Sequence, residues 1–83
     1  MKTEVLLRFS VKSGSEIEAV KMISDYIING YKVILNDRFY IRFEYEEKDK
    51  AAQYQISKDL KLIKIILKYF DVTYEIDESV ESA

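Results

Sequence analysis

Residues 31–46 have the sequence Tyr-Lys-Val-Ile-Leu-Asn-Asp-Arg-Phe-Tyr-Ile-Arg-Phe-Glu-Tyr-Glu, which carries the clearest structural signal in the chain. Residues 31–35 are mostly β-branched, aromatic or aliphatic, as strands are. In residues 38–46 apolar and polar side chains alternate, which is the period of a strand with one buried face. Asn36 and Asp37 separate the two runs and tolerate a positive φ, so the stretch predicts a tight β-hairpin.

A strand and a helix are predicted upstream of the hairpin. Residues 3–11 place apolar side chains at odd positions and mostly polar ones at even positions, which predicts a half-buried strand. Ser13 and Glu16 have the spacing of a helix capping box. Apolar residues then recur at helical intervals, namely Ile17, Val20, Ile23 and Ile27. The pair Asn29-Gly30 is predicted to end this helix, since glycine suits the left-handed position past a helix end.

A long helix and a last strand are predicted downstream of the hairpin. Residues 50–69 carry apolar side chains spaced by three or four, namely Ala52, Ile56, Leu60, Ile63 and Leu67. Residues 70–76 alternate again, which predicts a strand with Phe70, Val72, Tyr74 and Ile76 on one side. Residues 77–83 are acidic and small, and are predicted to form a disordered tail. A single domain over residues 1–76 is therefore expected.

The predicted order of elements is strand, helix, strand, strand, helix, strand. This is the split βαβ arrangement of the α+β class, the ferredoxin-like sandwich. Right-handed crossovers place both helices on one face of a four-stranded antiparallel sheet. The strands that begin at Thr3 and Arg38 are expected to be central. Because many unrelated functions use this fold, function has to be argued from the surfaces.

The composition argues against catalysis. The chain has no His and no Cys, so the usual general base, thiolate nucleophile and zinc ligands are missing. Its two glycines, Gly14 and Gly30, lie too far apart to form a phosphate-binding loop. We therefore predict a protein that is not an enzyme, with no catalytic residue, bound metal, cofactor or small-molecule substrate.

The same composition bears on location and source. No apolar run approaches the roughly 18 residues of a membrane span, and the first residues lack the apolar core of a signal peptide. A cytoplasmic protein without a membrane partner is expected. Ile, Lys, Tyr, Glu and Asp are abundant and glycine is scarce, which is typical of AT-rich genomes, including those of many viruses. A small viral inhibitor, acting in the host cytoplasm, is one specific form that this bias suggests.

The long helix carries a second apolar stripe opposite its core stripe. Its members are Tyr54, Leu62, Ile65 and Tyr69, and Lys58 is one of several lysines that border them. More apolar surface than one sheet can bury indicates a binding face. The favoured function is therefore a protein-interaction module, either a homodimer or an inhibitor or regulator of a protein partner. Met22 and Tyr26 on the first helix either extend this surface or are buried where the two helices pack together.

The alternative is binding of single-stranded nucleic acid, RNA in particular, by the open face of the sheet. Alternation predicts that this face carries Arg8, Lys32, Arg38, Tyr40 and Arg42. Arginine offers a fork for phosphate and a plane for stacking on bases, and tyrosine offers a second stacking plane. Glu4, Glu44 and Glu75 are expected on the same face, where they can pair with the arginines. With a net charge of −2, this function ranks second.

Overall fold

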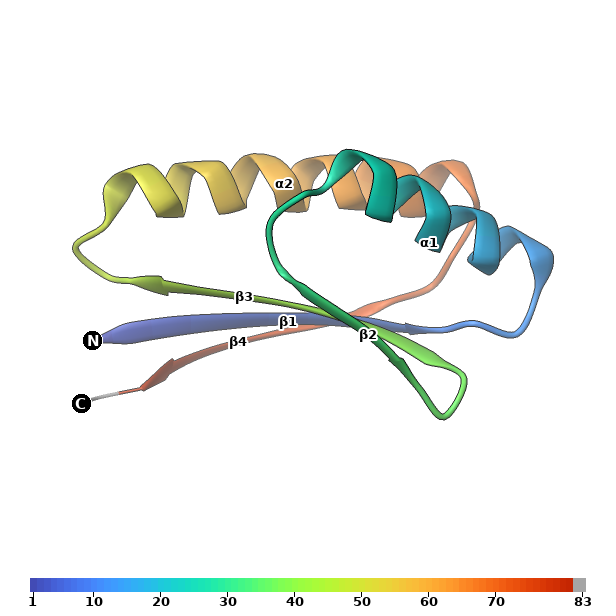
Figure 1. The fold of residues 1–83 in the computed structure, drawn as a ribbon, viewed down its shortest axis with the longest axis horizontal. Coiled ribbons are helices and arrows are strands. Elements are labelled where there is room, and N and C mark those ends of the chain that lie inside the picture. Colours follow the sequence, from blue (N-terminus) through green and yellow to red (C-terminus); the bar gives the residue numbers. More distant parts are fainter. Residues whose placement is uncertain (82–83) are drawn as a thin grey trace.

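A computed structural model describes residues 1–81, in which four strands and two helices follow one another in the order βαββαβ (Figure 1). The elements are β1 (Lys2–Ser10), α1 (Gly14–Tyr26), β2 (Tyr31–Leu35), β3 (Arg38–Glu46), α2 (Lys50–Tyr69) and β4 (Glu75–Glu81). The strands form one antiparallel sheet in the order β2-β3-β1-β4, and both helices lie on the same face of it. The predicted ferredoxin-like α+β fold is confirmed.

The core lies between the two central strands and the helices. Leu7 of β1 and Ile41 of β3 are cross-strand neighbours, and both are fully buried. Phe9 and Phe39 form the next pair on the same face, with ring centroids 5.2 Å apart. The helices cover these side chains with Ala19, Ile23, Ile56, Ile63, Ile66 and Leu67. Fully burying one such aliphatic side chain stabilises the fold by about 1.5 to 3 kcal/mol.

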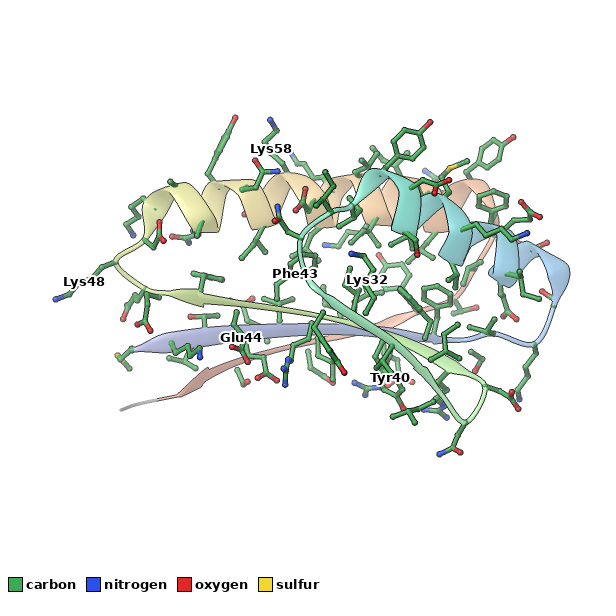
Figure 2. All side chains as sticks on the ribbon, in the orientation of Figure 1. Lys32, Tyr40, Phe43, Glu44, Lys48 and Lys58 are labelled. Atoms are coloured by element: carbon green, nitrogen blue, oxygen red, sulfur yellow. The ribbon has the colours of Figure 1, made fainter. Side chains whose placement is uncertain are left out.

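The hairpin turn fixes the register of β2 against β3. Asn36 and Asp37 have φ values of 52° and 61°, as in a type I′ turn, so Leu35 pairs with Arg38. Because a two-residue loop joins the strands, odd positions of β2 share a face with even positions of β3. Lys32 therefore pairs with Ile41 and lies on the helix-covered side, opposite to Tyr40 (Figure 2). The prediction that Lys32 lies on the open face with the arginines is wrong.

Helix α1 is shorter than the sequence predicts, and one of its predicted core residues is exposed. It ends at Tyr26, followed by an extended Ile27, whereas the predicted end was Asn29-Gly30. Gly30 has the expected positive φ, 91°, but uses it to direct the chain from the α1–β2 connection into β2. Ile17 was expected in the core and is 46% exposed, because it lies about 120° around the helix from the buried Ile23.

The last strand begins later than predicted. Strand β4 spans Glu75–Glu81 and pairs with β1 from Arg8 to Lys2, whereas the sequence predicted a strand over residues 70–76. Phe70 and Asp71 instead form a turn at the end of α2, with a φ of 56° at Asp71, and residues 72–74 connect this turn to β4. Val72 in this connection is buried against the core. The expected tail contributes residues 77–81 to the strand, and residues 82–83 lie outside the described part. Acidic side chains are tolerated here because β4 is an edge strand with an open face.

Glu16 closes the capping box at the start of α1. Its Oε1 accepts hydrogen bonds from the backbone N–H of Lys12 and, at 2.8 Å, from that of Ser13. These bonds favour the ionised carboxylate and lower the pKa of Glu16. A lowered pKa means that the contribution of Glu16 to stability is present above its ordinary pKa of 4.5 and is lost as the pH falls through the folded-state value.

We therefore expect Glu16→Gln to weaken the acid dependence of stability. Thermal melts from about pH 7 to about pH 3 should show a smaller loss of Tm for this variant than for the wild type. Glu18→Gln removes a charge from the same helix without removing the cap, and should follow the wild-type profile more closely. Identical acid dependence in wild type and Glu16→Gln would show that this cap does not contribute.

Candidate functional site

An apolar groove runs between the two helices on the surface that faces away from the sheet. Its volume is about 300 Å³, and it is lined by Met22, Tyr26, Leu62, Ile65, Ile66 and Tyr69. The two lining residues from α1 are one turn apart, and those from α2 span two turns. No carboxylate, ammonium, guanidinium or amide group belongs to this lining, so the only polar side-chain atoms in it are the tyrosine hydroxyls and the methionine sulfur.

The floor of the groove is buried and its walls are exposed. Ile66 is 4% exposed and belongs to the core, whereas Leu62 is 37% and Ile65 64% exposed. Tyr69 is exposed as well, and its ring packs edge-on against the ring of Phe70, with centroids 4.9 Å apart. The groove therefore presents large apolar side chains to water on a backbone that is fixed by the core beneath it.

The structure brings together part of the predicted binding face. Leu62, Ile65 and Tyr69 line the groove with Met22 and Tyr26 of α1. Of the two residues from α1, Tyr26 is exposed and Met22 is half-buried. Tyr54 and Lys58 lie nearer the N-terminal end of α2 and do not line it. They form a separate contact, in which the Lys58 Nζ lies 5.5 Å from the centroid of the Tyr54 ring.

The charged side chains along the two edges of the groove differ between α2 and α1. On α2 the exposed charged side chains after the first turn are all lysines, namely Lys58, Lys61, Lys64 and Lys68. None of the four makes an ion pair with a carboxylate in the described part of the chain. Lys58 projects from α2 away from the sheet (Figure 2). On α1 the exposed charges are Glu18, Lys21 and Asp25, of which Lys21 and Glu18 are 4.0 Å apart.

On the open sheet face Arg8 is engaged by β4. Its guanidinium donates to Glu75 at 2.8 Å and to Asp77, and both acids are held opposite β1 by the strand register. The hydrogen bond to Asp77 is the largest contribution that raises the pKa of Arg8, and the charges of both acids add to it. The expected pairing of Arg8 with Glu75 is present. Asp77 is a second partner, which was not predicted because residue 77 was assigned to the disordered tail.

The other arginines of this face differ from one another. Arg42 lies 5.5 Å over the ring of Tyr31, and its Nε is 3.6 Å from Glu44. Glu44 also pairs with Lys2 at 3.0 Å, and that contact is the main reason why the pKa of Glu44 is lowered. Arg38 is exposed and makes no ion pair within residues 1–81.

Next to the arginines the sheet carries an apolar hollow that sequence reasoning missed. It has a volume of about 200 Å³ and is lined by Leu6, Tyr31, Val33, Leu35, Tyr40 and Arg42. The side chains of Tyr31, Val33 and Leu35 reach this face because of the hairpin register. The two-residue turn was the signal that could have identified these residues, because it places odd positions of β2 on the same face as even positions of β3.

A larger, mixed hollow of about 520 Å³ lies beside the N-terminal half of α2. It is lined by Asn29, Gly30, Tyr31, Arg42, Phe43, Glu44, Ala52, Gln55 and Ile56. The Gln55 side-chain amide donates at 3.1 Å to Oδ1 of the buried Asp59, while Oδ2 of Asp59 has no hydrogen-bond partner among the described residues. No group of three potential metal ligands occurs in residues 1–81. Sequence reasoning did not single out Asp59.

Comparisons with known proteins bear on the fold alone. No protein-family model matches the chain, and no curated protein matches it. Among solved structures it is similar to the de novo designed protein Foldit4, with a TM-score of 0.58 and 15% identity over 99% of this chain and 100% of that one. It is also similar to the de novo designed protein Ferredog-Diesel, with a TM-score of 0.50 and 7% identity over 93% and 84% of the two chains.

Proposed function

We propose that this protein is a non-enzymatic interaction module that binds a protein through the groove between α1 and α2. The observation that carries the proposal is the exposure of large apolar side chains along a concave surface. Tyr26, Ile65 and Tyr69 are each more than half exposed although they line one continuous groove. Contiguous apolar surface of this kind marks interaction sites in water-soluble domains.

The groove has the features of a binding surface that carries much of its energy in few residues. Tyrosine is enriched among the residues that dominate protein interfaces, and here two tyrosines stand at its edges. Covering Leu62 and Ile65 removes aliphatic surface from water, at roughly 25 cal/mol per Å² of apolar area. A regulator or inhibitor that acts by occupying the surface of another protein needs no catalytic group.

The contacts on the sheet favour the groove over nucleic-acid binding. A phosphate that approaches Arg8 has to displace Glu75 and Asp77, which already occupy both ends of its guanidinium. Arg42 is engaged by Glu44 and Tyr31. Acidic side chains of β4 would also lie beside any bound phosphate, where like charges repel.

The test is affinity capture from an extract of the native cells, with and without nuclease. We expect a protein that is retained after nuclease treatment and that Arg38→Ala/Arg42→Ala captures as well as the wild type does. Anisotropy titrations with short RNA and DNA homopolymers should show no salt-sensitive binding. Capture that is lost on nuclease treatment, or in the arginine variant, would contradict the proposal and favour the sheet face.

A further inference from the structure

The shape and lining of the groove restrict the conformation of its occupant. An extended peptide would bring unpaired backbone N–H and C=O groups against a lining that is almost wholly apolar, and each such buried group is costly. A helix satisfies these groups internally. Leu62 and Tyr69 are about two helical turns apart, roughly 10 Å, so two turns of an incoming helix can cover the groove.

The charges on α2 restrict the composition of that occupant. Within α2 the only carboxylate is that of Asp59, which is 8% exposed and belongs to the buried side of the helix. Lys61 precedes Ile65 by four residues and Lys68 follows it by three, so both flank this groove residue on the helix surface. We propose that the occupant is an acidic amphipathic helix of a partner protein, an inference that rests on the proposed function.

The edge of the groove formed by α1 restricts the orientation of the incoming helix. Glu18 and Asp25 are exposed there, and Lys21 forms an ion pair with Glu18. The acidic flank of the incoming helix therefore faces α2, while the flank over α1 is neutral or basic. Charges at the rim of an interface contribute more to association rate and register than to affinity. The exposed apolar side chains that line the groove therefore supply most of the binding energy.

A second copy of the chain fits this surface less well. The apolar ridge that a second copy offers is α2, and seating it in the groove would bring its lysines against those of the first copy. An anionic membrane also fits less well, because the surface is concave and Glu18 and Asp25 would face the lipid phosphates. Among the helices of residues 1–81, neither combines the length and the apolar character that a membrane span requires.

The experiment uses two synthetic helical peptides of about four turns with identical leucine spacing. One carries glutamate on one flank of the leucine stripe, and the other carries lysine at the same positions. We expect the glutamate peptide to bind at least about tenfold more tightly at low salt, with the difference shrinking as salt screens the charges. Lys61→Glu/Lys68→Glu should reverse the preference. Lys48→Glu reverses one lysine charge in the β3–α2 loop, far from the groove, and should leave the preference unchanged (Figure 2).

Several outcomes would overturn the inference. Equal binding of both peptides in the groove, or no binding of either, would overturn it; the proposed function would still stand if a captured protein is lost with Leu62→Glu/Ile65→Lys. If light scattering shows self-association that depends on concentration and is lost in the same variant, the occupant is a second copy of the chain. Sedimentation with phosphatidylserine vesicles would make a membrane the occupant. If no protein is captured through the groove at all, the proposed function fails as well.

Discussion

Leu62→Glu combined with Ile65→Lys is expected to abolish capture of the partner protein while leaving the fold intact. Both positions line the groove, so a bound partner would have to bury two charged groups against an apolar lining. The penalty for such burial is several kcal/mol, of which about 2.7 kcal/mol already corresponds to a 100-fold loss of affinity. We therefore expect the affinity for the partner to fall by about 100-fold or more.

The fold should tolerate this change because neither side chain belongs to the core. Leu62 is 37% and Ile65 64% exposed, so the introduced charges can reach water in the free protein. Leu35→Glu is the matched control, because Leu35 is 56% exposed and lies on the open sheet face. Circular dichroism should be native for both variants, and only the groove variant should lose the partner. If Leu35→Glu abolishes capture and the groove variant does not, the partner binds on the sheet instead.

Gly30→Ala is expected to destabilise the protein by about 2 to 4 kcal/mol. At φ 91° a side chain is strained whatever the space around it. In addition, an added Cβ would lie 2.8 Å from Phe43 Cε1 and 3.1 Å from Ile41 Cγ1. Both neighbours are buried in the core and cannot move aside without disturbing it. The estimate combines the penalty for a positive φ with that for overpacking.

Gly14→Ala is the matched control for this prediction. Gly14 begins α1, and an added Cβ there would meet no atom within 4 Å. This substitution should be neutral, or should stabilise the protein by up to about 1 kcal/mol by restricting the unfolded chain. Urea denaturation of both variants measures the difference. Equal stability of the two would show that the approach of Gly30 to Phe43 does not constrain the fold.

The fold could be predicted because its signals are local and agree with one another. Alternation in 3–11 and 38–46, the helical period in 50–69 and the Asn36-Asp37 turn all specify the same topology. The position of the last strand could not be predicted in this way. Val72 is buried in the core although it lies in the connection between α2 and β4, so its apolar character resembles that of a strand residue. The position of β4 is instead set by its pairing with residues 2–8 of β1.

The candidate site could be predicted in part for a similar reason. The second stripe of α2 follows from helical geometry, and Leu62, Ile65 and Tyr69 do line one surface. Tyr54 shares the face of the helix but not the groove, because α1 has only 13 residues and flanks α2 along part of its length. Lys32 was misplaced by a single position of register, which moves a side chain to the opposite face of a sheet.

Photocrosslinking from within the groove can show directly whether the partner binds there. A benzophenone amino acid placed at Ile65 should form a specific crosslink to one protein in an extract of native cells, and excess wild-type protein should compete it away. The same probe at Leu35, on the opposite side of the molecule, should give no competed crosslink. If the probe at Leu35 gives a crosslink that wild-type protein competes away and the probe at Ile65 gives none, the partner does not bind in the groove between α1 and α2.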